Sequence, residues 1–419
     1  MVDANRTFVI VGGGLAGAKA AETLREEGFT GRVILIGDER DHPYERPPLS
    51  KGYLTGKEER DGVFVHETAW YARADVELHL GQVVTSIDRA GRSVQLGDNT
   101  VVHYDKLLLA TGAEPRRLDI PGTDLVGVHH LRRLAHADRL RHVLSALGRD
   151  NGHLVIAGGG WIGLEVAAAA RGYGAEVTVV EPAATPLHHV IGPELGQIFT
   201  DLHTAHGVRF HFGARLTEIT GQDGLVLAAR TDTGEEHPAH DVLAAIGASP
   251  RTVLAEAAGL DMAAPEHGGG VAVDTSLRTS DPHIFAAGDI ASVEHPLFGT
   301  RLRVEHWANA LNGGPAAARA MLGQDVVYDR VPYFFSDQYD LGLEYSGWAP
   351  PGSYDQVVIR GDAGKREFIA FWLKDRRVLA GMNVNVWDVT DSIQRLIRGG
   401  RETDPEALGD PSVPLDSLI

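Results

Sequence analysis

Three glycines and one acid in the middle of the chain have the types and spacing of a nucleotide-binding site. Gly158, Gly160 and Gly163 follow the apolar run LVIA, and Glu181 ends a second apolar run. Glycine at these positions allows a tight turn, the approach of the backbone to a pyrophosphate, and close contact between helix and strand. The pyrophosphate binds at the helix N-terminus, where unpaired N–H groups and the helix dipole favour negative charge. A glycine-rich turn without a ligand has the same spacing, but the flanking runs and the terminal acid favour nucleotide binding.

A second copy of this pattern lies near the N-terminus. Gly12, Gly14 and Gly17 follow the run TFVIV, and the first glycines of the two copies lie 146 residues apart. Asp38 follows at the distance from which an acid reaches a ribose hydroxyl, although a solvated loop acid is the alternative and Glu39 is the next candidate. Two such units predict two dinucleotide sites.

A proline-rich loop follows the first unit. Its sequence, DHPYERPPLSKGYL, cannot form a regular helix, and it carries Arg46 and Lys51. A rigid loop with two basic residues near a phosphate-binding turn suggests a site, but solvated basic residues would look the same.

Polar and small residues also follow two apolar strands, where nucleotides bind at the carboxyl edge of a sheet. The strand LLLA, which ends at Ala110, leads to Thr111 and Gly112. The strand HIFAA leads to Gly288 and Asp289, so that Asp289 could meet a ribityl chain. A helix predicted over 304–322 carries Trp307 near its start, where the helix dipole would favour an anionic flavin.

The composition excludes several functions. The chain has 419 residues, which predicts two or three domains, and its formal net charge of -18 makes nucleic-acid binding a poor prediction. With no cysteine it can hold no disulfide, thiolate metal site, iron–sulfur cluster or redox-active thiol, so disulfide and peroxide reduction are excluded. His203 and His206 have the spacing of metal ligands, but we interpret them as surface histidines and predict no metal site. No apolar run is long enough to span a membrane, and we expect a cytoplasmic protein.

The elements that position these residues repeat along the chain. Residues 7–39 and 154–181 each predict strand, glycine turn, helix and strand, and LLLATGAEPR is echoed by DVLAAIGASPR, so the repeat covers whole domains. Residues 131–147 and 193–207 predict helices. Aromatic-rich strands from Tyr328, with a helix near 387–398, predict a separate α+β domain with an antiparallel sheet, followed by an acidic tail over the surface.

Several motifs together carry a family resemblance that extends from about residue 7 to 400. They are ERPPLSK (45–51), LLLATG (107–112), GGGWIGLE (158–165), IFAAGD (284–289) and VPYFFSDQYD (331–340). With the first glycine turn, they resemble the NADH-dependent ferredoxin reductases that serve bacterial oxygenases and cytochromes P450. PPLSK together with SDQYD is far more specific than the glycine motifs.

The resemblance implies an α/β fold like that of glutathione reductase, with two Rossmann-type dinucleotide-binding domains and a C-terminal α+β domain. The implied domains are an FAD-binding domain (1–114 and 248–327), an NADH-binding domain (115–247) and a C-terminal domain (328–419).

The resemblance also assigns roles by position. For FAD, the implied contacts are with the pyrophosphate (Gly12, Gly14, Ala16, Gly17), the adenosine ribose (Asp38), the ribityl chain (Asp289) and the flavin ring (Trp307). Further residues are implied to line the FAD site (Arg46, Lys51, Val83, Arg132). For NADH, the implied contacts are with the pyrophosphate (Gly158, Gly160, Ile162, Gly163) and the nicotinamide (Glu165, Gly247).

Glu181 favours NADH over NADPH. Its carboxylate can accept hydrogen bonds from both ribose hydroxyls but would repel a 2'-phosphate, and residues 182–187 offer no Arg or Lys. The family often has Arg where this chain has Thr185, so the adenine pocket is expected to be weaker or differently closed.

The implied reaction is hydride transfer from NADH to the flavin N5, followed by two single-electron transfers. Lys51 near N5 would stabilise the reduced flavin. Lys51 and Glu165, which come from different domains, could form an ion pair that nicotinamide binding rearranges.

The implied electron acceptor is a small acidic [2Fe-2S] ferredoxin that feeds an oxygenase or a cytochrome P450. Residues 357–401 hold nine Lys and Arg against five acids, which suggests a docking patch, although a solvated face is the alternative. Rubredoxin reduction, or redox signalling as in the related apoptosis-inducing factors, remains open. We expect a monomer or weak dimer.

Overall fold

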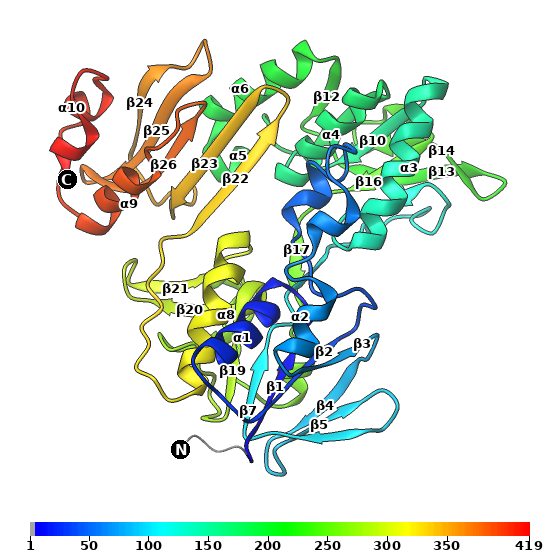
Figure 1. Ribbon diagram of the computed structural model, residues 1–419. Coiled ribbons are helices and arrows are strands. Elements are labelled where there is room, and N and C mark those ends of the chain that lie inside the picture. The colour runs from blue at the N-terminus through cyan, green and yellow to red at the C-terminus, as the bar shows by residue number, and fades with distance from the viewer. Residues whose placement is uncertain (1–4) are drawn as a thin grey trace. The chain divides into compact units, whose positions relative to one another are not determined.

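The computed structural model describes residues 5–419, which separate into two compact units (Figure 1). Unit 1 contains the residues up to Glu45 together with Arg60–Glu114 and Ser249–Pro332. Unit 2 contains Arg46–Glu59, Pro115–Ala248 and Tyr333–Ile419. The proline-rich loop thus groups with the second glycine motif, and the predicted division into three domains stays a prediction.

Unit 1 is built on a parallel sheet with strand order β19-β7-β1-β2-β3. The central strands are almost wholly buried because helices cover the sheet, and they read as continuous apolar runs. Its strands are β1 (Thr7–Val11), β2 (Arg32–Gly37), β3 (Val76–Leu80), β7 (Lys106–Leu109) and β19 (Ile284–Ala286). Its helices are α1 (Leu15–Glu26), α2 (Thr68–Arg73), α7 (Val253–Ala257) and α8 (Trp307–Met321).

Helices α1 and α8 lie side by side in unit 1 (Figure 1). Small residues permit this contact, since a Cβ on Gly314 would overlap the backbone oxygen of Ala16. Two small sheets complete the unit, namely β4 (Val84–Asp88), β5 (Ser93–Leu96) and β6 (Val101–His103), and β18 (Val271–Val273), β20 (Ala291–His295) and β21 (Thr300–Arg303).

Unit 2 contains a second parallel sheet, with strand order β12-β11-β10-β16-β9. A three-stranded meander, β13-β14-β15, packs its apolar side chains against one face of this sheet. The sheet strands are β9 (Val128–His129), β10 (His153–Ala157), β11 (Glu176–Glu181), β12 (Val208–Phe212) and β16 (Asp241–Ala244). The helices are α3 (Leu134–Asp150), α4 (Trp161–Tyr173), α5 (His188–Ile191) and α6 (Pro193–Ala205), and the meander strands are β13 (Leu216–Gln222), β14 (Leu225–Thr231) and β15 (Glu236–Pro238).

The C-terminal part of unit 2 is an antiparallel sheet with order β22-β23-β26-β25-β24, as the aromatic-rich strands predicted. Its core is shared with α4 and α6, because Leu164 and Phe199 belong to the same buried cluster as Trp372. The strands are β22 (Tyr333–Gln338), β23 (Leu341–Gly347), β24 (Gln356–Asp362), β25 (Glu367–Lys374) and β26 (Arg377–Val384), followed by α9 (Thr390–Gly399) and α10 (Pro405–Gly409).

The acidic tail lies on the surface of this sheet, as predicted. The Arg360 guanidinium donates to the backbone oxygens of Leu408, Asp410, Pro411 and Val413 and so fixes the tail. Two short strands, β8 (Ala113–Pro115) and β17 (Ala248–Pro250), lie where the chain passes from one unit to the other.

Candidate functional site: two glycine cradles and a buried ion pair

The two glycine motifs form the same structure in the two units. A Cβ on Gly12 would overlap the backbone oxygen of Ala110, and a Cβ on Gly158 would lie 2.5 Å from that of Ala245. A Cβ on Gly17 would likewise overlap the oxygen of Gly12, and a Cβ on Gly163 that of Gly158. These four glycines are therefore required by the packing of each strand–turn–helix unit.

The middle glycine of each motif has a different environment. No heavy atom lies within 4 Å of a Cβ placed on Gly14 or Gly160, and each residue is the N-cap of its helix without a side-chain cap. Neither α1 nor α4 has an acidic residue in its first turn. Each motif thus leaves open space and uncapped N–H groups at a helix N-terminus, which fits a pyrophosphate.

The acid predicted to bind the first ribose is held by a basic residue. The Arg251 guanidinium donates to Asp38 Oδ2 at 3.0 Å, and Glu39 accepts from the Tyr44 hydroxyl at 2.7 Å. The backbone of Arg251 also bonds to Thr111 Oγ1 (3.0 Å) and to the oxygen of Gly112 (3.0 Å). Arg251 therefore links Asp38 to the end of β7. This role was not predicted from the sequence, although Arg251 ends the repeated segment DVLAAIGASPR.

Gly288 and Asp289 follow β19 directly, as predicted. Gly288 has φ +76 and lies close to Ala16, while Asp289 is only 8% exposed. His306, the N-cap of α8, lies near Asp289, and desolvation lowers the pKa of this histidine to about 4. A neutral ring at pH 7 adds no positive charge to the N-terminus of α8, where the helix dipole favours an anion.

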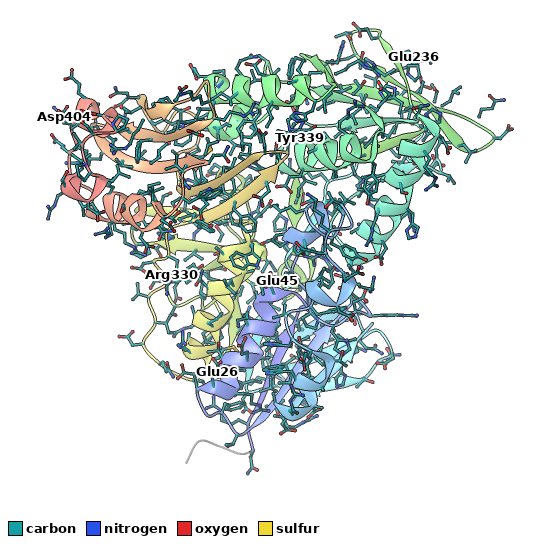
Figure 2. The ribbon with its side chains drawn as sticks, turned by 45° about the horizontal axis from the view of Figure 1, so that its top comes forward. Glu26, Glu45, Glu236, Arg330, Tyr339 and Asp404 are labelled. Carbon is teal, nitrogen blue, oxygen red and sulfur yellow. The ribbon has the colours of Figure 1, made fainter. Side chains whose placement is uncertain are left out.

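Trp307 begins α8 and contacts an acid that the sequence reading did not consider. Burial raises the pKa of Glu45, and a hydrogen bond from the Trp307 side chain and the charge of Lys19 oppose that rise. Glu45 is labelled in Figure 2. Val83, also predicted to line the flavin, is 52% exposed, so this apolar side chain is free to contact a ligand.

Glu181 holds the second glycine turn in place. Its Oε2 accepts from the Gly159 amide at 2.7 Å and its Oε1 accepts from the Ala183 amide at 2.8 Å. Each carboxylate oxygen retains a lone pair, so the same group can still accept from ribose hydroxyls. Thr185 is buried and packs against Gly196, where a larger Arg side chain would not fit without rearrangement.

The Lys51–Glu165 ion pair predicted from the sequence is present within unit 2. Lys51 Nζ lies 2.8 Å from Glu165 Oε1, and the Glu165 side chain is only 2% exposed. The Ser336 hydroxyl donates to the same oxygen at 2.6 Å, and the Ser50 hydroxyl donates to Oε2. Lys51 Nζ also lies 5.1 Å from the centre of the Phe335 ring. The buried carboxylate therefore has one cation and two hydroxyl donors, as a charge removed from water requires.

A chain of hydrogen bonds extends from Glu165 into the core of unit 2. The Gln338 amide donates to Ser336 Oγ at 3.0 Å, and its oxygen lies 2.8 Å from His203 Nε2. Burial lowers the pKa of His203 to about 4, against the effect of the Gln338 hydrogen bond. The ring is therefore neutral and donates through Nε2 to Gln338, which orients the whole chain toward Glu165.

The interpretation of His203 as a surface histidine was wrong. Its side chain is fully buried, whereas the exposed His206 stacks on Tyr339 and bonds through Nδ1 to the oxygen of Leu202. Tyr339 is labelled in Figure 2. The two rings do not share a ligand position, because each already has a separate partner.

The remaining predicted residues lie in unit 2. The Arg46 guanidinium donates to the backbone oxygen of Arg132, so these two predicted residues are neighbours. Ile162 is 42% exposed in the first turn of α4, and Gly247 has φ +96 and accepts from the Arg116 amide at 2.9 Å. Arg46, Lys51 and Arg132 belong to a different unit from the first glycine cradle, so their contact with FAD stays a prediction.

The predicted basic patch is largely neutralised in space. Five of its nine cations pair with acids outside residues 357–401, namely Arg366 with Asp340, Lys374 with Asp355, Arg376 with Asp404, Arg377 with Glu402 and Arg395 with Asp416. Arg360 is committed to the tail. The charge count along the segment therefore overstated the positive charge of this surface.

Comparisons with known proteins agree with this geometry. A model of the pyridine nucleotide-disulphide oxidoreductase family matches residues 6–314, and a reductase C-terminal model matches residues 333–419. The ferredoxin–NAD(+) reductase component of the anthranilate 1,2-dioxygenase system of Burkholderia cepacia is 38% identical over 98% of this chain and 99% of its own. A rubredoxin-NAD(+) reductase of Pseudomonas putida is 35% identical over 90% of this chain and 96% of its own.

A solved structure matches the whole chain. A chain of the covalent putidaredoxin reductase–putidaredoxin complex is 34% identical, covers 100% of this chain and 99% of its own, and superposes with a TM-score of 0.93. Among residues 5–419, no helix is both long and apolar enough to cross a membrane.

Proposed function

The chain belongs to the pyridine nucleotide-disulphide oxidoreductase family, and from that membership we propose that it is an FAD-dependent NADH:ferredoxin oxidoreductase. It takes electrons from NADH and delivers them to a small acidic [2Fe-2S] ferredoxin, which supplies an oxygenase or a cytochrome P450. The ferredoxin and the terminal oxygenase are not specified by the sequence. A cytoplasmic location and a monomeric or weakly dimeric state stay predictions.

The observation that carries this proposal is the pair of equivalent glycine cradles in one chain without cysteine. Two dinucleotide sites fit one flavin and one nicotinamide cofactor. A relative that reduces disulfides needs a redox-active thiol, which this chain cannot provide. The absence of a thiol route within the chain fits the delivery of electrons from NADH to an external carrier.

The residues of unit 1 fit FAD. The uncapped N-terminus of α1, with Gly14, would hold the pyrophosphate, and Asp38 the adenosine ribose. Asp289 would meet the ribityl chain, and the dipole of α8 at Trp307 would favour the anionic reduced form. Bound FAD supplies the redox chemistry, because it accepts a hydride from NADH and releases electrons singly.

The residues of unit 2 fit NADH. The uncapped N-terminus of α4, with Gly160, would hold the pyrophosphate, while Gly247 would lie beside the nicotinamide. Glu181 would accept from the ribose hydroxyls and repel a 2'-phosphate. Thr185 packs beside the proposed adenosine site but carries no charge. The preference for NADH over NADPH is therefore assigned to Glu181.

Lys51 and Glu165 are proposed to respond to the nicotinamide. The carboxylate is held by three donors, and a nicotinamide amide that competes for one of them would change the position of Lys51. Stopped-flow reduction of the flavin by NADH tests this role, with Lys57→Met as the control because Lys57 is an exposed lysine of the same loop. Lys51→Met should slow flavin reduction while the control does not, and an unchanged rate would remove Lys51 from the mechanism.

Rubredoxin reduction is the second candidate. It is favoured by the similarity to a rubredoxin-NAD(+) reductase over 90% of this chain. Redox signalling, as in the apoptosis-inducing factors, is a third reading that predicts slow turnover and a long-lived complex of reduced flavin with NAD.

The experiment is a comparison of carriers under NADH. The FAD-loaded protein is assayed with a [2Fe-2S] ferredoxin and with a rubredoxin, each coupled to cytochrome c. Multiple turnovers that are faster with the ferredoxin support the proposal, and faster reduction of rubredoxin would favour the second candidate.

A further inference from the structure

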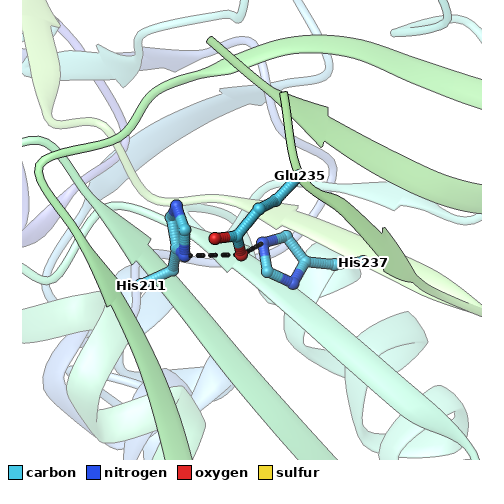
Figure 3. Close-up of side chains that lie close together, drawn as sticks. All are labelled: His211, Glu235 and His237. Atoms are coloured by element: carbon cyan, nitrogen blue, oxygen red, sulfur yellow. Dashed lines mark ion pairs between the residues drawn. The ribbon is translucent and has the colours of Figure 1, made fainter. Parts of the chain in front are cut away.

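Two histidines and a glutamate from separate segments of unit 2 converge on one point (Figure 3). His211 lies on β12, the edge strand of the parallel sheet, and His237 lies on β15 of the meander. Glu235 lies in the turn before β15. Among residues 5–419, this is the one group of three His, Cys, Asp or Glu whose ligand atoms all lie within 4.8 Å of one another.

We propose that His211, Glu235 and His237 bind a Zn²⁺ ion, with a fourth position left to water. Zinc prefers imidazole nitrogen and carboxylate oxygen at about 2.0–2.2 Å, and three protein ligands with one open position is a common arrangement. With such bonds, the ligand atoms of a tetrahedral site lie roughly 3.3 Å apart. No thiolate competes for the ion, because the chain has no cysteine.

The observed distances bracket the value for a tetrahedral site. His211 Nδ1 lies 3.0 Å from Glu235 Oε2, and His237 Nε2 lies 4.0 Å from the same oxygen. Figure 3 shows both rings directed at the Glu235 carboxylate. All three ligand atoms lie within 4.8 Å of one another, and a bound ion would draw them toward the roughly 3.3 Å spacing of a tetrahedral site.

His237 Nε2 is buried and has no hydrogen-bond partner among the described residues, so an ion would satisfy it. A buried polar atom without a partner is costly, and such atoms require an explanation.

The second nitrogen of His211 also has a fixed partner. His211 Nε2 lies 3.0 Å from the Thr233 hydroxyl, which in turn bonds to Thr231 Oγ1 at 2.8 Å. A metal-binding histidine commonly donates its other N–H to such a group, which fixes the tautomer. Donation from Nε2 to Thr233 leaves the lone pair of Nδ1 directed at Glu235.

The surrounding charges do not oppose the ion strongly. The guanidinium of Arg209, which lies on β12 with His211, is paired with Glu176 at 3.0 Å. The Glu235 side chain is 59% exposed, which leaves the site open to ions from solvent. An ion there would link the edge strand β12 of the parallel sheet to β15 of the meander, two strands that belong to different sheets.

The test is isothermal titration of ZnCl₂ into the tag-free, FAD-loaded protein. We expect one Zn²⁺ per chain and, in Glu235→Gln and His237→Gln, an affinity at least about tenfold lower, the scale on which even supporting residues affect metal affinity. Thr233→Val should weaken binding by about tenfold through the tautomer of His211. Mg²⁺, which prefers oxygen ligands, should not compete.

Matched controls separate this site from adventitious binding. Glu236→Gln changes the adjacent acid (Figure 2), which pairs with Arg230, and His142→Gln changes an exposed histidine on α3. Both should bind Zn²⁺ like the unchanged protein. Glu235→Gln alters only an exposed side chain, so it should fold normally, as its circular dichroism will show. No stoichiometric binding, or equal affinity in Glu235→Gln and Glu236→Gln, would overturn the proposal.

Discussion

We predict that the two partners of the buried Lys51–Glu165 ion pair contribute unequally to stability, with Lys51→Met costing more than Glu165→Gln. Lys51→Met leaves the Glu165 carboxylate, 2% exposed, with only the Ser50 and Ser336 hydroxyls as donors. Removal of one partner from a buried ion pair costs about 3–5 kcal/mol, and we expect about 3 kcal/mol because two hydroxyls remain. Glu165→Gln should cost less, about 1–2 kcal/mol, because Lys51 is 15% exposed and its flexible chain can turn toward water.

A double-mutant cycle measures the pair directly. Guanidinium unfolding of the FAD-loaded protein, followed by tryptophan fluorescence, gives the free energy of unfolding for both single variants and for the double variant. The double variant should be more stable than the sum of the single changes predicts, with an interaction energy of about 2 kcal/mol. Lys57→Met, an exposed change in the same loop, should have little effect. Additive single changes, or a larger cost for Glu165→Gln than for Lys51→Met, would refute the reasoning.

Three further predictions concern the cradle, the cofactor preference and the effect of pH. Gly163→Ala should destabilise unit 2 by about 1–3 kcal/mol, because the added Cβ overlaps the backbone oxygen of Gly158. The Cβ of Gly160→Ala enters open space, so this variant should fold normally but bind NADH more weakly. If a titration shows that Gly160→Ala binds NADH with unchanged affinity, the proposed pyrophosphate site at Gly160 is contradicted. Glu181→Gln should lower kcat/KM for NADH, because charge-assisted hydrogen bonds of about 1.5–3 kcal/mol to the ribose are weakened. It should also reduce the preference for NADH over NADPH, because the repulsion of a 2'-phosphate is removed. An unchanged ratio of kcat/KM for NADH to that for NADPH would show that other residues set the preference. Burial lowers the pKa of His203 to about 4, below the value of roughly 6.5 for a histidine in the unfolded chain. The folded protein should therefore keep its full stability above pH 6.5 and lose up to about 3 kcal/mol as the pH falls toward 4. Unfolding measured across this range should depend less on pH in His203→Gln, and an identical pH dependence would count against the burial of a neutral ring.

Features that depend on local spacing were predicted correctly. Both glycine cradles were found because strand, turn and helix are encoded within about 30 residues, and each glycine contacts backbone of its own unit. The Lys51–Glu165 pair was found only through the family motifs. Spacing alone could not join residues that lie 114 positions apart.

Features that depend on the fold were missed. Ser50 and Ser336 lie 115 and 171 residues from Glu165, although both belong to the motifs PPLSK and SDQYD, which were the available signal. His203 looked like a surface residue because its partner, Gln338, lies 135 positions away. The basic segment was misjudged for the same reason, since its acidic partners lie outside the counted window.

The most direct test of the central claim is anaerobic reduction of a [2Fe-2S] ferredoxin by the FAD-loaded protein with NADH, followed through the visible spectrum of the cluster. The account predicts that catalytic amounts of the protein reduce the ferredoxin over many turnovers, and that NADPH supports this reaction far less well. A flavin that accepts a hydride from NADH but passes no electrons to ferredoxin would contradict it.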